Sequence, residues 1–170
     1  GGLVVMDENT CMVDVAKFFM GFTQRESCGK CGPCRIGTKR MLELLQKITE
    51  GKGEMADIDK LEETAKFIQS RSLCGLGKSA PLPVISTLQN FRHEYEEHIL
   101  ENKCRAHVCE AMKIYSIDPD KCKGCTKCAR NCPVSAITGN KKEPHEIDQT
   151  KCIKCGTCMD NCSFGAISIK

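Results

Sequence analysis

The chain has 170 residues, a formal net charge of +3, 5% aromatic residues and no tryptophan, so it can hold one large or two small domains with modest apolar cores. No apolar run approaches the roughly 18 residues of a membrane helix, and we expect no membrane-spanning segment. Fifteen residues are cysteine, an odd number, and no signal-peptide pattern is present. We therefore expect metal-bound thiolates in a reducing cytoplasm rather than a secreted disulfide scaffold.

The part of the chain from Met12 to His98 is expected to form four helices of about 10 to 20 residues, because apolar residues recur there at helical spacing. Breaks at 51–53 and 75–83, which contain glycine and proline, precede the third and fourth helices. Asp57 is expected to cap the third helix. Such short connections favour a compact bundle. The residues expected to face its core are Val13, Ala16, Phe19, Met20, Met41, Leu44, Leu45, Ile48, Ile58, Leu61, Ala65, Ile68, Val84, Leu88, Phe91, Tyr95 and His98.

The chain changes character near Lys113, where a repeat begins. IDPDKCKGCTKCARNCPVSAITG from Ile117 aligns with IDQTKCIKCGTCMDNCSFGAISI from Ile147, a shift of 30 residues. Each half predicts a short strand, a cysteine loop, a helical turn and a second short strand. The charged segment 139–145 is expected to be a loop between the halves, with His145 exposed to solvent.

Nine of the cysteines form three triplets of the pattern C-x₂-C-x₂-C. Three thiolates at this spacing can hold three corners of a [4Fe–4S] cluster, and each triplet then needs one more sulfur. Cys132 and Cys162 follow the second and third triplets at the C-x₃-C distance, which leaves Cys74 for the first. Zinc ribbons use pairs of cysteines, so the third cysteine of each triplet would be surplus in them. The triplets are Cys28, Cys31, Cys34; Cys122, Cys125, Cys128; and Cys152, Cys155, Cys158.

The formal charge of the bare chain does not indicate nucleic-acid binding. A [4Fe–4S] core with four thiolates carries about −2 in its usual oxidised state. Three such sites would bring the loaded protein from +3 to about −3. We expect no nucleic-acid partner.

The duplicated half resembles the bacterial two-cluster ferredoxin over about residues 114–170. In that family the fourth cysteine of each run binds the other cluster. The resemblance implies one cluster on Cys122, Cys125, Cys128 and Cys162, and another on Cys152, Cys155, Cys158 and Cys132. Pro133 fits the family motif, whereas Ser163 stands where the family has proline after the second run. This departure leaves one turn less rigid and should not affect ligation.

The motifs ESCGKCGPCRIGT, SLCGLG and VVMDE resemble the C-terminal helical domain of the NADH-binding flavoprotein subunit of respiratory Complex I. That family also includes the beta subunits of NAD(P)-dependent and electron-bifurcating hydrogenases and related formate dehydrogenases. The resemblance covers about residues 1–98 and implies a [4Fe–4S] cluster on Cys28, Cys31, Cys34 and Cys74. That cluster would accept electrons from a flavin mononucleotide bound upstream. FMN and NAD(P) would bind only in the missing upstream domain, because the glycine-rich segment that holds them is absent here.

The expected fold class is α+β, a four-helix bundle carrying one [4Fe–4S] cluster followed by a ferredoxin-like domain with two. Residues 1–11, in which Leu3-Val4-Val5 looks like the tail of a strand, are expected to be the end of the missing upstream domain. Residues 12–102 form the helical iron–sulfur domain, residues 103–113 a linker with a candidate zinc site, and residues 114–170 the ferredoxin domain.

Cys11, Cys104 and Cys109 remain, and with one imidazole they would complete a tetrahedral zinc site that is structural and redox-silent. His107 lies between two of these cysteines, whereas His98 lies on the inward face of the fourth helix. Related beta subunits often lack a histidine between the cysteines and have one six residues before the first, which favours His98. Three ordinary buried cysteines are the alternative.

The order of helical cluster domain, short linker and ferredoxin pair is most similar to the beta subunits of bifurcating [FeFe]-hydrogenases. The resemblance implies electron relay between the upstream FMN and ferredoxin or a hydrogenase subunit. The implied hetero-oligomer contains the hydrogenase catalytic subunit and a small [2Fe–2S] subunit, with external ferredoxin as a partner. The short linker suggests that the ferredoxin domain moves as a bridge in electron bifurcation.

Two alternatives remain open at this point. The same module could serve an NAD-dependent formate dehydrogenase or a Complex I-like assembly. A protein of another class, a non-redox zinc-binding scaffold, would also use many cysteines. The sequence offers no nucleophile–base pair among its four histidines and no phosphate-binding loop, so no catalytic residue is expected within the chain.

Overall fold

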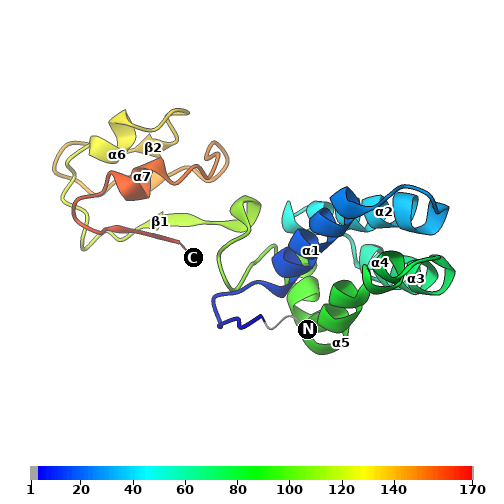
Figure 1. Ribbon diagram of the computed structural model, residues 1–170. Helices are drawn as coiled ribbons and strands as arrows, with labels where there is room; N and C mark the ends of the chain where they lie inside the picture. The colour runs from blue at the N-terminus through cyan, green and yellow to red at the C-terminus, as the bar shows by residue number, and fades with distance from the viewer. Residues whose placement is uncertain (1–3, 170) are drawn as a thin grey trace. The chain divides into compact units, whose positions relative to one another are not determined.

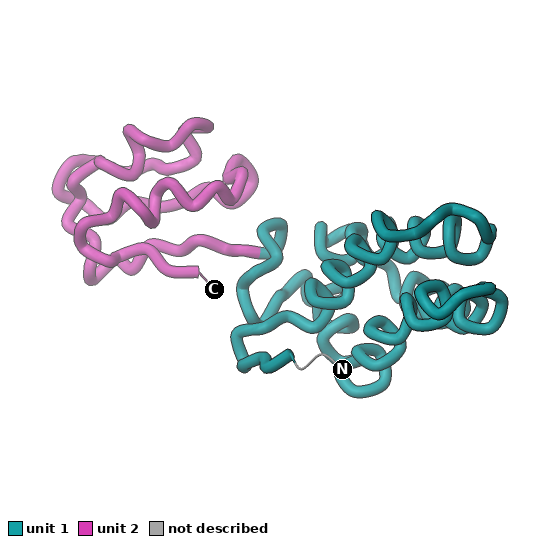
Figure 2. The backbone as a smooth tube through the Cα atoms, viewed as in Figure 1, with its two compact units in different colours: residues 1–112 teal, residues 113–170 magenta. Residues whose placement is uncertain are grey.

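The computed structural model describes residues 4–169. The chain divides into two compact units, residues 1–112 and residues 113–170, shown in different colours in Figure 2. The first unit is helical, and the second contains short strands and two short helices. Each unit has its own cluster of buried apolar residues. The predicted α+β class is therefore confirmed.

Over its described residues, 4–112, the helical unit contains four long helices and one short one (Figure 1). They are α1 (Met12–Glu26), α2 (Gly32–Thr49), α3 (Met55–Arg71), α4 (Gly75–Ser79) and α5 (Leu82–Leu100), followed by a 3₁₀ turn, η1 (Glu110–Met112). Helix α1 packs against α2 and α5, and α3 packs against α2, α4 and α5. The short α4 occupies the segment predicted as a break before the last helix.

Most residues predicted to face the helical core are buried there. Phe19 and Leu44 are only half-buried. Phe91 is wrong as a core residue, since its side chain is 38% exposed. Its backbone leaves the helical region, with φ −133° and ψ 32°, and this kink in α5 takes the ring out of the inward stripe. Tyr95 and His98 follow the kink and are fully buried.

The start of α3 differs from the prediction by three residues. Glu54 is the N-cap, and Asp57 lies at the third helical position, where the two residues form a capping box. The amide of Glu54 donates to Asp57 Oδ2 at 2.9 Å. Asp57 is buried and also pairs with Lys47 at 2.8 Å. The error arose because a capping box places an acidic residue at both positions, and only the first begins the helix.

The segment before α1 contains no helix or strand among its described residues. Val4 and Val5 are exposed and lie outside any strand. The predicted strand tail is therefore wrong for these two residues, and Leu3 lies outside the described residues. An Asx-type turn follows, in which the Asn9 amide donates to Asp7 Oδ1 at 3.1 Å.

The second unit is built from two similar halves, each with strands that flank a cysteine loop and a short helix. Its elements are β1 (Tyr115–Ile117), α6 (Lys127–Arg130), β2 (Ile137–Thr138), β3 (Glu146–Ile147), α7 (Thr157–Asp160) and β4 (Ile167–Ile169). The first strand of one half pairs antiparallel with the last strand of the other, β1 with β4 and β2 with β3. Ile117 lies opposite Ile167, and Ile137 opposite Ile147. This exchange lets the halves bury the isoleucines that neither could bury alone.

The prediction for His145 is wrong. It ends the loop between β2 and β3, but its side chain is only 2% exposed. Gly139 runs so close that a Cβ placed there would lie 2.7 Å from His145 Cγ. The loop therefore folds back over the ring instead of leaving it in solvent.

Among residues 4–169, no helix combines the length and apolar character that a membrane crossing requires.

Packing of α2 on α3 gives a test of the helical core. A Cβ added to Gly37 would lie 2.5 Å from Ile68 Cγ1, whereas one added to Gly21 in α1 would meet only Leu42 Cδ1 at 3.9 Å. We expect Gly37→Ala to lower the free energy of unfolding by about 1–3 kcal/mol through overpacking. The control Gly21→Ala should leave it unchanged or raise it by up to about 1 kcal/mol. Thermal unfolding of the two variants checks this, and equal stability would contradict the close packing.

Candidate metal centres

Four side chains from distant parts of the helical unit meet in its buried interior. Cys11 precedes α1, His98 lies near the end of α5, and Cys104 and Cys109 follow that helix. All four are buried, and their ligand atoms lie within 4.8 Å of one another. Cys11 Sγ lies 3.3 Å from His98 Nε2 and 3.9 Å from Cys109 Sγ. Cys109 Sγ lies 3.4 Å from the same nitrogen.

These separations fit a single tetrahedral ion. With zinc–sulfur bonds of about 2.3 Å, two thiolates of a tetrahedral site lie about 3.8 Å apart. The four cysteines of a [4Fe–4S] cluster bind four separate irons, so their sulfurs lie farther apart than ligands of one ion. The group Cys11, His98, Cys104 and Cys109 therefore matches a mononuclear centre in both its donor set and its spacing.

The ring of His98 is oriented for metal binding. Its Nδ1–H donates to the carbonyl oxygen of Glu94 at 2.7 Å, one turn earlier in α5. This bond leaves Nε2 facing the thiols, which is the usual arrangement for a histidine ligand. Glu94 also accepts the amide of Met12 at 2.9 Å through Oε2. The same glutamate thus fixes the ring and joins the start of α1 to α5.

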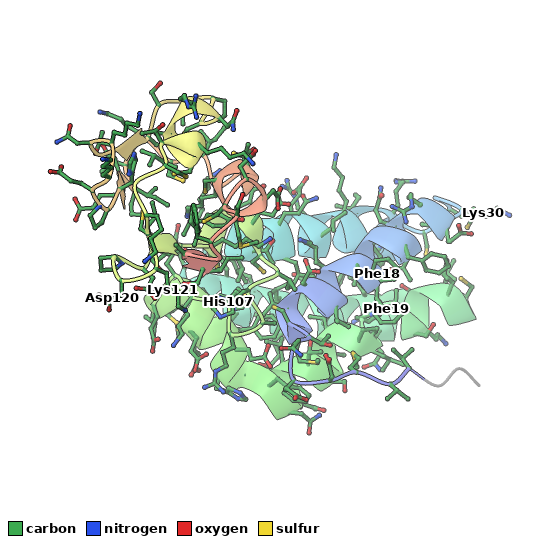
Figure 3. All side chains as sticks on the ribbon, turned by 90° about the vertical axis from the view of Figure 1, so that its left-hand side faces the viewer. Phe18, Phe19, Lys30, His107, Asp120 and Lys121 are labelled. Carbon is green, nitrogen blue, oxygen red and sulfur yellow. The ribbon has the colours of Figure 1, made fainter. Side chains whose placement is uncertain are left out.

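His107 lies outside this group. It sits on the segment between Cys104 and Cys109 (Figure 3) and is only half-buried, with a left-handed backbone φ of 53°. Among the described residues, the histidine that the structure brings to the three cysteines is His98.

The imidazole and the thiols of this group shift one another's pKa values. Burial opposes a charged imidazolium, but hydrogen bonds with Cys104 and Cys11 outweigh it and raise the pKa of His98 to about 10. Hydrogen bonds with Cys109 and Cys11 lower the pKa of the Cys104 thiol, so a thiolate forms readily. A bound cation would replace these protons and satisfy the thiolates together.

The first triplet lies at the start of α2, on an open part of the helical unit. Cys28 and Cys74 are exposed, Cys31 is half-buried and Cys34 is buried. The backbone turns at Gly29 with φ +73°, and Pro33 stands in the first turn of α2. Lys30, in the same loop, projects at the edge of this unit (Figure 3). An anionic group held here would face the positive end of the α2 dipole.

Contacts around Cys31 show that the Cys74 segment lies beside the triplet. Hydrogen bonds from the amides of Leu73 and Cys34 lower the pKa of the Cys31 thiol. A Cβ on Gly77 would lie 2.6 Å from Ser72 Cβ and 3.3 Å from Cys34 Cβ. The start of α4 therefore packs against the start of α2.

Two serines near this triplet were not singled out from the sequence. Ser27 Oγ lies 3.3 Å from Cys34 Sγ. Ser72 is buried, and its hydroxyl is among the groups that lower the pKa of the Cys31 thiol. A hydroxyl can donate to a thiolate or sulfide, so both serines lie where they could donate to sulfur atoms of a cluster held here.

The ferredoxin-like unit contains two similar cavities, and each is lined by four cysteines from both halves. The first is lined by Cys122, Cys125, Cys128 and Cys162. The second is lined by Cys152, Cys155, Cys158 and Cys132. These are the two sets implied by the ferredoxin resemblance, with the fourth cysteine of each contributed by the other half.

The backbone around these cavities provides donors for sulfur. The amide of Ala136 donates to Cys132 Sγ, and that of Ala166 to Cys162 Sγ, each at 3.3 Å. Burial raises the pKa of Cys128 and raises that of Cys158 to about 11. Without metal these two thiols remain protonated at neutral pH, and a positively charged core would displace their protons.

Two known families match separate parts of the chain. The family described as the NADH-ubiquinone oxidoreductase-F iron-sulfur binding region matches residues 14–98, which include the first triplet, Cys74 and His98. The chain belongs to this family. The 4Fe-4S dicluster domain matches residues 114–163, which include all eight cysteines of the two cavities.

Relatives of this oxidoreductase-F family member include components of two kinds of complex. It is 56% identical over 145 residues to "NADP-reducing hydrogenase subunit HndC" of Solidesulfovibrio fructosivorans, covering 85% of this chain and 30% of the relative. It is 47% identical over 102 residues to the F subunit of the NADH-quinone oxidoreductase of Streptomyces coelicolor, covering 60% of this chain and 23% of the relative. The chain thus spans less than a third of the length of either relative.

A solved structure shares the fold of part of this family member. The crystal structure of an NAD⁺-reducing [NiFe]-hydrogenase in the H₂-reduced state matches with a TM-score of 0.54 and 33% sequence identity. The match covers 56% of this chain and 17% of the hydrogenase chain. In the present family member, three residues that contact candidate ligands could not be recognised from the sequence: Glu94 beside His98, Ser27 beside Cys34 and Ser72 beside Cys31. None has a spacing signal, because each acts through a contact made only in the folded chain.

Proposed function

We propose that the chain is the electron-transfer module of a flavin and iron–sulfur oxidoreductase, similar to the corresponding part of NADP-reducing hydrogenase. The observation that carries this proposal is the union of an oxidoreductase-F iron–sulfur region with a dicluster domain in one chain. The 56% identity to the hydrogenase relative extends over both parts, because it covers 85% of the chain.

We infer that three [4Fe–4S] clusters bind to twelve cysteines. The first takes Cys28, Cys31, Cys34 and Cys74, which is supported by the contact of the Leu73 and Ser72 segment with Cys31 and Cys34. The second and third take the two cysteine sets that line the cavities. Each cluster, when bound, can accept and release one electron at a time.

Every one of these proposed sites has four cysteine ligands, so none leaves an open position for a substrate. The residues of this chain then bind, orient and shield the carriers and perform no bond chemistry. Cys28 and Cys74 are exposed, and Leu73 beside Cys74 is 81% exposed. This open edge suits electron exchange with a flavin in an upstream domain, whereas the ferredoxin-like unit suits exchange with ferredoxin or a hydrogenase subunit.

We propose that Cys11, His98, Cys104 and Cys109 bind one zinc ion. Support comes from their mutual distances, their burial and the orientation of the His98 ring by Glu94. Zinc is redox-silent, so this centre would be structural. All four ligands belong to the helical unit, where the ion would join the start of α1 to the segment that follows α5.

The same proposal has three further parts. The chain assembles with a hydrogenase catalytic subunit and a [2Fe–2S] subunit, and it is located in the cytoplasm. The ferredoxin-like unit moves as a bridge in bifurcation. The second candidate is the same module in a Complex I-like assembly, which is favoured by the identity to the NADH-quinone oxidoreductase relative. Identification of the polypeptides that co-purify with the full-length protein separates the two.

Metal content tests the central proposal. The anaerobically purified chain should contain about twelve irons and twelve inorganic sulfides, with broad brown absorption that dithionite bleaches. Iron and sulfide assays with a dithionite titration measure this. Zinc in place of iron would contradict the redox function and support a zinc scaffold.

The ligand assignment of the first cluster predicts the effect of one substitution. Cys74→Ser should reduce iron from about twelve to about eight per chain, because the three remaining thiolates of the triplet hold a cluster poorly. The control Ser70→Ala changes an exposed position on α3 that bonds only to the helix carbonyl of Phe67. Its iron content should stay unchanged. Full iron content in the Cys74 variant would exclude this residue as a ligand.

The zinc proposal predicts a difference between two histidine variants. His98→Gln should lose most of the zinc and unfold at lower temperature, because a structural site with three thiolates and no imidazole binds the ion less tightly. His107→Gln is the matched control and should keep one zinc per chain. Elemental analysis and thermal unfolding provide the two measurements. Zinc retained by the His98 variant would overturn the ligand set.

A further inference from the structure

The two halves of the ferredoxin-like unit differ at one buried position beside the cavities. At the shift of 30 residues that relates the halves, Tyr115 of β1 corresponds to His145 at the start of the β3 segment. Both side chains are buried, with exposed fractions of 4% and 2%. His145 lines the cavity of Cys122, Cys125, Cys128 and Cys162, and Tyr115 lines the cavity of Cys152, Cys155, Cys158 and Cys132.

The polar atoms of these two rings have different surroundings. Tyr115 reaches the start of α7, since a Cβ built on Gly156 would lie 3.0 Å from its hydroxyl oxygen. Its hydroxyl thus lies against Gly156, which lines the same cavity. In His145, Nδ1 lies 3.1 Å from the carbonyl oxygen of Glu143, and which of the two ring nitrogens carries hydrogen depends on the tautomer. Nε2 is buried and has no hydrogen-bond partner in the protein.

A buried nitrogen without a partner costs free energy unless something in the loaded protein pairs with it. The wall that His145 forms belongs to a cavity lined by four cysteines. A cluster held there would offer sulfur atoms that can only accept, and the tautomer with hydrogen on Nε2 would donate to one of them. The orphaned nitrogen therefore fits a donor to the cluster.

A second difference between the halves also favours added negative charge at the cavity that contains His145. Lys123 lines the cavity that contains His145, and its counterpart at the other cavity is Ile153. The lysine is exposed, so water screens much of its charge. It nevertheless adds a cation at the cavity that already has the imidazole, and none at the corresponding place in the other.

We propose that His145 is a positioning residue that raises the reduction potential of the cluster held by Cys122, Cys125, Cys128 and Cys162 above that of its repeat-related partner. Reduction adds negative charge to a cluster, and a hydrogen bond to its sulfur stabilises the more negative state. The two clusters are therefore unequal, and an electron entering this unit rests beside His145. The inference depends on the proposed iron–sulfur function and goes beyond it by assigning an order to the two carriers.

Exchange of the repeat-related residues tests this order in the full chain. His145→Tyr keeps an aromatic ring in the wall but removes the imidazole, and Tyr115→His adds one at the other cavity. Redox titrations followed by electron paramagnetic resonance should resolve three midpoint potentials in the unaltered chain. In His145→Tyr one of them should become more negative. At its original midpoint, the reduced fraction of that cluster should fall from one half to about a fifth, the size expected for one hydrogen bond.

In Tyr115→His a different midpoint should become more positive, with the other two unchanged. The control His93→Tyr alters an exposed histidine of α5 and should change none of them. Iron analysis of every variant separates failure of the iron–sulfur function from failure of the proposed order. If the iron content is full and His145→Tyr leaves all three midpoints unchanged, the proposal is overturned. It is equally overturned if both substitutions move the same midpoint.

Discussion

Convergence of cysteine sulfur atoms from distant segments is the constraint on which the rest of this protein depends. In the helical unit, three thiols and one imidazole gather inside the apolar core next to Tyr95 and Met112. Burying these polar groups without a shared partner is costly. One cation would satisfy all of them, and α1 and α5 are held in the positions that make this convergence geometrically possible.

The same constraint explains the exchange of strands in the ferredoxin-like unit. Each half contributes three cysteines to one cavity and one to the other. The antiparallel pairing of β1 with β4 and of β2 with β3 brings the fourth cysteine across. The apolar contribution is small, because the buried core cluster among the described residues of this unit consists of Tyr115, Cys128, Ile137 and Ile167. Metal binding and folding are thus expected to be strongly coupled in it.

The sequence predicted well those features that depend on spacing. Regular spacing of cysteines and apolar residues along the chain predicts three features that the structure also has. They are the repeat at 30 residues, the four long helices and the inward position of His98. The kink at Phe91 and the helix α4 were not predicted, because packing overrides local helix preference at those positions. The burial of His145 was missed for a similar reason: a charged loop with glycine and proline indicates solvent, and only the closure of Gly139 over the ring reverses that expectation.

Duplication normally makes two sites alike, and here it preserves the cysteines and the amide donors to Cys132 and Cys162. Clusters with four cysteine ligands at each cavity would have no open coordination position at which the two sites could differ in chemistry. Such clusters would differ in how strongly the surrounding protein favours the added electron. Polar groups in the cavity wall are therefore where function can diverge after duplication. The substitution of an imidazole for a phenol at one repeat-related position changes that wall without changing a single ligand.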